Sequence, residues 1–234
     1  MAELTREQFK TAVSDAVTGI LNVYREVDTM LRELGAALGG DEPRFVPLIK
    51  KLVPGAGSKN PDARYLRNYH AAIYALADES EEDEDEEEEE EGEDEEGDGA
   101  SPNKKTLTIQ TGGGIIVARA TVYQSGSASG FEPSLVVGAL TGCRLDTSVP
   151  PGTGLKLSRS RFRKLLRVFD GHLTAGKQLK TGISTHVIDK PKEKHKLIFD
   201  VPASPHVMPL FDVTPAKIQE IAAAVRKVFA PTAG

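Results

Sequence analysis

The sequence predicts an α+β protein in three segments. Three observations indicate this class: apolar side chains recur at helical spacing from residue 6 to residue 38, short runs of β-type sequence follow residue 102, and the stretch between is strongly acidic. We therefore predict a helical association module at 1–77, a disordered acidic linker at 78–102 and a basic α+β domain at 103–234. In that last domain we expect an antiparallel or mixed sheet with two helices on one side.

The first predicted element is a long helix that begins at Arg6. Thr5 and Gln8 have the spacing of a capping box, Leu4 and Phe9 that of a hydrophobic staple, and Gly39-Gly40 provides a stop signal. Such a helix has about 33 residues and a length of about 50 Å. Its apolar residues form two seven-residue series, the d and a positions of a heptad repeat: Val13, Ile20, Val27 and Leu34, then Val17, Tyr24, Leu31 and Leu38.

Two interpretations of this stripe stay open, a helix packed in a globular bundle and a coiled-coil or oligomerisation helix. We predict two short helices after it, one over 41–53 and one opened by Pro61 with Tyr69 and Ile73 facing inward. Two short helices cover only part of the stripe. We therefore expect residues 6–38 to bind another protein or a second copy of the chain, with this interaction stripe: Val17, Tyr24, Val27 and Leu31.

Outside the acidic linker, the chain has a positive net charge. Of the 21 residues from Asp78 to Asp98, 18 are Asp or Glu, and since the whole chain has a net charge of -6, the rest sums to +12. Residues 99–234 alone carry 19 basic and 8 acidic groups. A run of like charges this dense repels itself and has no apolar surface to bury, which predicts disorder.

The C-terminal segment is predicted to form mainly strands. We expect a hairpin of 106–110 with 115–123 around the turn Gly112–Gly114, a buried strand at 134–140, a strand pair at 183–189 and 196–201, and an edge strand at 206–212. The sequence then predicts a final helix, with Thr214 as N-cap and Pro215 in its first turn.

A second helix is predicted over 160–169, and it is strongly basic. Its apolar residues lie at i, i+3, i+4 and i+7, and cations occupy the other faces. Together with lysines farther along, these cations predict a surface for nucleic acid or an acidic protein segment within 156–196. The predicted polyanion-binding residues are Arg159, Arg161, Arg163, Lys164, Arg167, Lys177 and Lys180.

The sequence contains no catalytic or metal-binding pattern. Cys143 is the only cysteine, so no intramolecular disulfide can form, and the histidines lack zinc-ligand spacing. We predict no cofactor, no metal site and no enzymatic activity. A hydrolase or nuclease would need ligands gathered from separate places in the chain: Asp146, Asp170, His172 and Asp189. No apolar run is long enough for a membrane span, and the N-terminus does not have the pattern of a secretory signal, which predicts a cytoplasmic protein.

The leading hypothesis is therefore a non-enzymatic binding or assembly protein whose basic domain is modulated by the acidic linker. The second is a nucleic-acid-binding protein that the acidic tract autoinhibits by competing for the same cations. A hydrolase or nuclease is the third.

Overall fold

In the computed structural model the chain forms an α+β fold, as predicted. The structure describes residues 5–48, 53–54, 69–76, 107–122, 132–147, 154–157, 159–169, 182–189 and 195–230. The predicted acidic linker, 78–102, lies outside these ranges. The helical elements are α1 (Arg6–Gly39), α2 (Arg159–Leu165), the short 3-10 turn η2 (Leu210–Asp212) and α3 (Pro215–Arg226). The strands are β1 (Phe45–Pro47), β2 (Val53–Pro54), β3 (Tyr69–Leu76), β4 (Leu107–Gln110), β5 (Ile115–Thr121), β6 (Ser134–Leu145), β7 (Gly154–Leu157), β8 (Gly182–Ile188), β9 (Leu197–Val201) and β10 (His206–Pro209).

One antiparallel sheet joins the two ends of the sequence. Its order is β1-β3-β5-β6-β9-β8, with β2 also on β3 and β10 also on β6. The register is continuous at the centre, where Ile73 pairs with Val117 and Val117 with Gly138. The predicted separation of an N-terminal module from a C-terminal domain is therefore wrong for the described residues, because β3 is a central strand of the sheet that β5 and β6 continue.

Where the structure describes them, the two short helices predicted after α1 are also wrong; residues 61–68, the start of the second, lie outside the described ranges. The segment from 41 to 54 contributes the edge strands β1 and β2, and the segment predicted to place Tyr69 and Ile73 on a helix is strand β3. Seven of the eight residues of β3 are buried, on both faces of the sheet. A strand covered on both faces has an apolar run in place of an alternating pattern, and such a run cannot be told from a buried helix by its periodicity.

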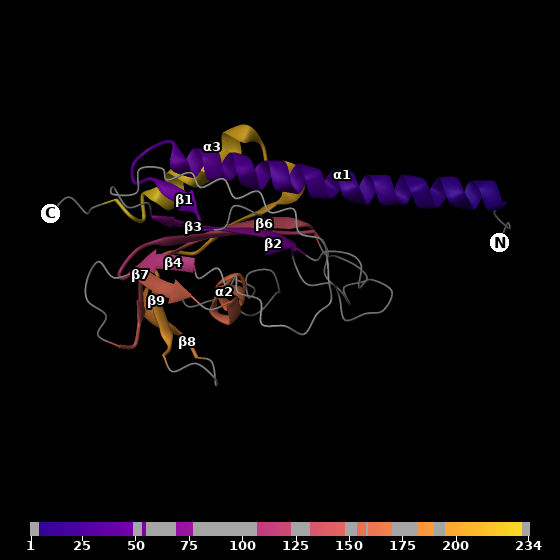
Figure 1. Cartoon of the computed structure of the whole chain (residues 1–234). Coiled ribbons are helices and arrows are strands. Elements are labelled where there is room, and N and C mark those ends of the chain that lie inside the picture. Colours follow the sequence, from indigo (N-terminus) through magenta and orange to yellow (C-terminus); the bar gives the residue numbers. More distant parts are fainter. Residues whose placement is uncertain are drawn as a thin grey trace, which may run out of the picture.

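The sheet is covered by helices on both faces (Figure 1). The C-terminal half of α1 and all of α3 pack on one face, against small residues such as Ala72, Ala118 and Ala139. The other face packs against α2 and the β4-β7 pair. The outer strands β9 and β8, called the strand arm below, continue the sheet beyond β6 and contribute residues to the same cluster. The prediction of two helices on one side is corrected here: α2 and α3 lie on opposite faces, because each has its own apolar side to bury.

Strand predictions beyond residue 102 are confirmed in part. Strand β6 matches the predicted 134–140 and extends five residues farther, and β8 pairs with β9 as expected. The predicted edge strand is present as β10 but ends at Pro209, and the predicted residues 210–212 form the turn η2 instead. The predicted hairpin is wrong: β4 pairs with β7 and β5 pairs with β3 and β6. The glycine turn is instead hydrogen-bonded to β6, where the amide of Gly112 donates to the Cys143 carbonyl at 2.8 Å.

The helix boundaries that capping residues predicted are confirmed. Helix α1 begins at Arg6 and ends at Gly39, and α3 has Thr214 as its N-cap with Pro215 in its first turn. Helix α2 ends at Leu165, four residues before the predicted end, and turns continue to Phe169. Leu4 of the predicted hydrophobic staple lies outside the described residues.

Candidate functional site

Among the described residues, the most unusual surface is the N-terminal half of α1, which extends beyond the edge of the sheet (Figure 1). Large apolar side chains there are between 36% and 60% exposed, whereas four leucine and valine side chains of the next turns on the same face are at most 5% exposed. The exposed set, called the projecting stripe below, consists of Phe9, Val13, Val17, Ile20, Leu21 and Val23. The buried continuation consists of Val27, Leu31, Leu34 and Leu38.

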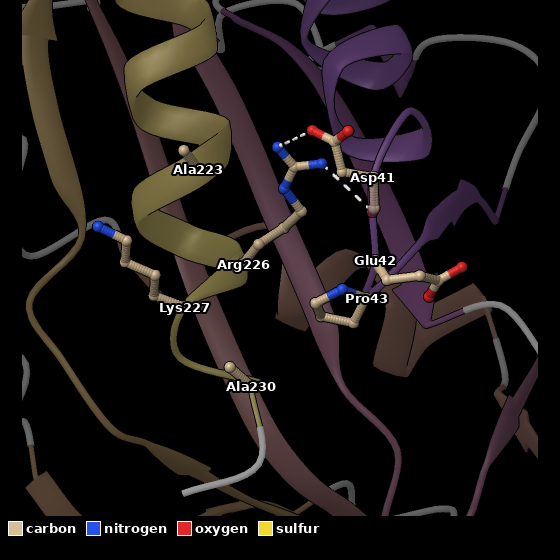
Figure 2. Close-up of a pocket in the computed structure, with 7 residues that line it drawn as sticks. All are labelled: Asp41, Glu42, Pro43, Ala223, Arg226, Lys227 and Ala230. Atoms are coloured by element: carbon tan, nitrogen blue, oxygen red, sulfur yellow. Dashed lines mark hydrogen bonds and ion pairs between the residues drawn. The ribbon is translucent and has the colours of Figure 1, made fainter. Parts of the chain in front are cut away.

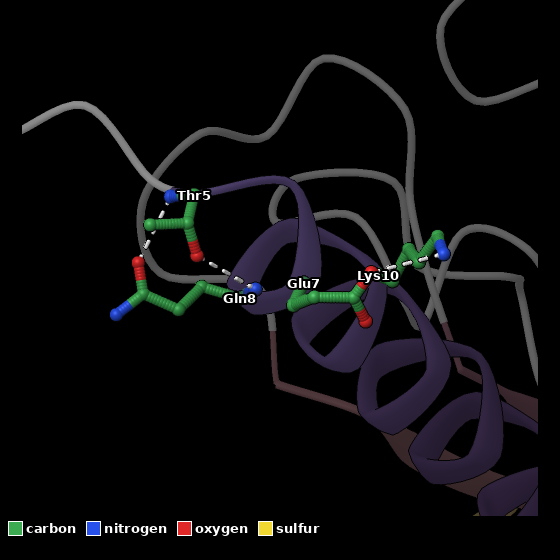
Figure 3. A network of polar contacts seen from close by, with 4 residues as sticks. All are labelled: Thr5, Glu7, Gln8 and Lys10. Atoms are coloured by element: carbon green, nitrogen blue, oxygen red, sulfur yellow. Dashed lines mark hydrogen bonds and ion pairs between the residues drawn. The ribbon is translucent and has the colours of Figure 1, made fainter.

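The projecting half is a regular helix with a well-formed start. Thr5 accepts a hydrogen bond from the amide of Gln8 at 3.3 Å, and the Gln8 side chain accepts one from the amide of Thr5 at 2.9 Å (Figure 3). Lys10 and Glu7 form an ion pair at 3.2 Å on the surface of the first turns. Isolated helices of this length are marginal in water, so continuity with the packed C-terminal half and this cap are what stabilise the projection.

A polar contact marks the point where α1 leaves the sheet. The ring of His70 on β3 is buried, and its Nδ1 atom lies 2.5 Å from the Asp28 carboxylate. The centroid of the same ring is 5.0 Å from the centroid of the Tyr24 ring. One turn on, the hydroxyl of Tyr74 donates to the Leu31 carbonyl at 2.7 Å, and burial raises the pKa of Tyr74. These two strand residues fix the position and rotation of α1, and therefore the direction in which the projecting stripe faces.

The predicted interaction stripe is thus divided. Val17 is exposed, Tyr24 is half-buried beside His70, and Val27 and Leu31 are buried inside this chain. Val27 and Leu31 are core residues in this structure because the sheet and α3 cover them. Phe9 and Leu21 belong to the exposed surface, although neither falls in the two seven-residue series. Burial against the sheet, which decides between these roles, leaves no mark in the heptad pattern.

Among the described side chains, two of the predicted polyanion-binding residues are exposed. Lys164 and Arg167 are exposed, whereas Arg161 is buried and donates from Nη2 to the His195 carbonyl. Arg161 therefore joins α2 to the strand arm and is not a free surface cation. The side chains of Arg159 and Arg163, and the whole of Lys177 and Lys180, lie outside the described part of the chain.

A further arginine, Arg119, lies near Arg167. Arg119 on β5 stacks on the Tyr69 ring, 4.1 Å from its centroid, and donates to the Leu166 carbonyl at 3.4 Å. Burial, together with the charge of nearby Arg167, lowers the pKa of Arg119 to about 10. Arg119 and Arg167 therefore both contribute to a positive potential near the C-terminal end of α2.

A small depression lies where α1 ends and α3 ends (Figure 2). It has a volume of about 260 Å³ and is lined by Asp41, Glu42, Pro43, Ala223, Arg226, Lys227 and Ala230. Its buried cation is already bound: Arg226 contacts the Asp41 carboxylate at 2.8 Å and donates to the Asp41 carbonyl at 3.2 Å. This contact ties the loop after α1 to α3, and we assign the depression a structural role.

The residues that a hydrolase or nuclease would need are not gathered in the described structure. Asp146 lies 3.4 Å from His195 and Asp189 lies 3.7 Å from Lys196, two separate surface pairs, while Asp170 and His172 fall outside the described ranges. Within those ranges there is also no group of three or more His, Cys, Asp or Glu side chains that could hold a metal ion. No described helix is both long enough and apolar enough to cross a membrane.

Comparison with known proteins found no matching family model, no matching curated protein and no matching solved structure.

The buried thiol of Cys143 is expected to make the free energy of unfolding depend on pH in the alkaline range. Burial, with a contribution from Asp200, raises the pKa of its thiol to about 12, against 9.0 for the free thiol. Because the folded pKa is raised, this stability contribution is complete below pH 9 and is lost as the pH rises from 9 towards 12. At pH 10 we expect the thiol to have lost about 1.4 kcal/mol, one pH unit past the unfolded pKa.

Urea unfolding of the wild type and of Cys143→Ala at pH 8 and pH 10 measures this loss as a difference, since tyrosines and arginines titrate equally in both proteins. An equal pH dependence in the two proteins would contradict the prediction.

Proposed function

We propose that this chain is a non-enzymatic assembly protein that docks an apolar helical face on the projecting half of α1. The single observation that carries the proposal is the division of one continuous helix face into a buried half and an exposed half. Exposed contiguous apolar surface with a polar surround is typical of protein interaction sites. Apolar residues with heptad spacing accept the side chains of another helix between them, which is why we specify a helical occupant.

The first test uses a synthetic helix as the probe. We expect a fluorescein-labelled peptide of four heptads, with leucine at the a and d positions and Glu or Lys elsewhere, to bind the full chain. The double variant Val17→Lys, Ile20→Lys should weaken this binding at least about tenfold, equivalent to about 1.4 kcal/mol, because each ammonium group would lose water in an apolar contact.

The matched control is Thr11→Lys, Thr18→Lys, which adds the same charge on the outward side of the same exposed helix. Fluorescence anisotropy measures the affinities, and circular dichroism checks that each variant is folded. Equal affinity of all three proteins, or no binding by any, would contradict the docking function.

A second candidate function, polyanion binding, is favoured by the exposed cations Lys164 and Arg167, in and directly after α2, and by the +11 net charge of residues 99–234. On this proposal the acidic tract, tethered to a region of +11, competes for the same cations at a high effective concentration. Deletion of residues 79–98 should therefore increase affinity for a labelled DNA duplex, and the gain should shrink as salt rises.

In the deleted protein, Arg167→Glu should weaken duplex binding, whereas Lys217→Glu on α3 should not do so to the same degree. Unchanged affinity on deletion at low salt would eliminate the autoinhibition, and absence of duplex binding in the deleted protein would eliminate the polyanion function.

A further inference from the structure

We infer that two arginines turned towards the protein, Arg161 and Arg119, are positioning residues: they hold α2 so that the exposed cations Lys164 and Arg167 contact a phosphate backbone, and they do not contact it themselves. This assignment rests on the proposed polyanion function and divides the arginines of its site by role. Helix α2 has seven residues. A helix this short is not stable on its own in water, so contacts from outside must fix its direction.

The first of these contacts is made from within α2. Arg161 lies in the first turn of the helix, is 6% exposed, and donates from Nη2 to the His195 carbonyl. The segment that carries this carbonyl is itself fixed. Directly after β6, the Asp146 amide donates to the Lys196 carbonyl at 3.1 Å, and the Asp146 carboxylate lies 3.4 Å from Nδ1 of His195. Arg161 therefore ties the start of α2 to the junction of β6 with the strand arm.

The second contact is made from the sheet. Arg119 on β5 donates at 3.4 Å to the Leu166 carbonyl, which directly follows the last residue of α2. The carbonyl groups at the C-terminal end of a helix have no partner within the helix, and an arginine there also interacts favourably with the helix dipole. The guanidinium group of Arg119 is fixed in turn, because it stacks on the Tyr69 ring, 4.1 Å from the centroid. The two arginines thus hold the two ends of α2.

The exposed cations are left on the outer side of this frame. The apolar side of α2 is buried in the same core cluster as the sheet, and Lys164 and Arg167 are exposed. The amide of Arg167 donates to the Lys164 carbonyl at 3.0 Å, which keeps the two residues one turn apart. A phosphate contact needs a cationic group at the surface, so Lys164 and Arg167 are the contact residues, whereas the guanidinium groups of Arg161 and Arg119 are engaged inside the protein.

Charge-conserving variants separate the two roles. We expect Arg167→Lys to bind a labelled DNA duplex within about twofold of the wild type, because an ammonium group still binds phosphate as a point charge. Arg161→Lys and Arg119→Lys should each weaken this binding at least about fivefold, because an ammonium group has no planar fork and does not stack on a ring as a guanidinium group does. Wild type and variants have the same net charge, so long-range attraction to the duplex is equal in all of them.

Fluorescence anisotropy at low salt measures these affinities, both in the full chain and in the chain without residues 79–98. Lys164→Gln and Arg167→Gln provide a second measurement at exposed positions. Each should lower the slope of log affinity against log salt by about 0.9, the value for one phosphate contact, and leave the midpoint of urea unfolding unchanged. Tyr69→Leu, which removes the ring beside Arg119 and no cation, replaces a lysine variant that fails to fold, and it should weaken duplex binding in the same way.

Wild-type affinity of the Arg161→Lys and Arg119→Lys variants, or a loss in Arg167→Lys as large as theirs, overturns the positioning role. An unchanged salt slope in both glutamine variants overturns the contact role of Lys164 and Arg167. Duplex binding that these substitutions leave intact eliminates only the assignment of roles, whereas absence of duplex binding in both chains eliminates the polyanion function and the assignment together.

Discussion

Leu31→Ala is expected to lower the free energy of unfolding by about 3 to 4 kcal/mol, as is typical when a buried leucine is truncated in a packed core. The Leu31 side chain is fully buried between α1, the sheet and α3, and its carbonyl accepts the hydrogen bond from Tyr74. Removal of Cγ and its two methyl groups leaves a cavity that the surrounding strands cannot fill completely by relaxation. Urea unfolding monitored by circular dichroism measures the loss.

The matched substitution on the same helix face is Val17→Ala, two heptads earlier. Because Val17 is about half exposed, we expect a change within about 0.5 kcal/mol in the free energy of unfolding measured under monomeric conditions. The contrast between the two alanine variants locates the point where the stripe changes from core to surface. Similar losses at both positions would mean that the N-terminal half of α1 is packed like the C-terminal half, and would remove the basis for a docking surface.

Gly138→Ala is expected to destabilise the protein by about 1 to 3 kcal/mol, the usual cost of overpacking. A Cβ atom on Gly138 would lie 2.2 Å from Cζ of Phe169, and that ring is itself buried against the sheet. Gly138 pairs with Val117 at the centre of the sheet, so the strand cannot move away without distorting its neighbours. The ring must shift, and with it the turn that follows α2.

A double-mutant cycle makes this prediction specific. Phe169→Leu shortens the side chain at the ring atoms that meet the new methyl group, so Gly138→Ala and Phe169→Leu together should cost less than the sum of the two single changes. The control is Gly19→Ala, since no atom lies within 4 Å of its Cβ position. It should not lower the free energy of unfolding, because alanine is the better helix former. Additive losses in the cycle would show that the cost at Gly138 has another origin.

The positions that the sequence predicted best are those where a local rule acts. The start of α1 at Arg6 follows from the Thr5 and Gln8 cap, its end at Gly39 from the glycine pair, and the start of α3 from Thr214 with Pro215. Each of these signals involves hydrogen bonds or dihedral angles within a few residues, so no distant part of the chain is needed to interpret them.

The predictions that failed concern residues whose role is set by distant partners. Tyr69 and Ile73 have helical spacing, yet they lie on a strand because β5 supplies a hydrogen-bonding partner more than 40 residues away in the sequence. Arg161 lies in a basic stretch that predicts a surface cation, yet its side chain is buried and donates a hydrogen bond to the His195 carbonyl. His70 and Asp28 gave no signal in the sequence, since 42 residues separate them.

The sequence by itself determined the α+β class, the length of α1, its unbroken apolar stripe and the charge partition between the acidic tract and the rest of the chain. Only the tertiary structure decided which half of that stripe is core and which half is surface. The physical reason is that both halves satisfy the same periodicity, and periodicity records that a helix has an apolar side without recording what covers it. The sheet is long enough to cover α1 from Val27 onwards and ends before Val23, and that difference in length creates the projecting stripe.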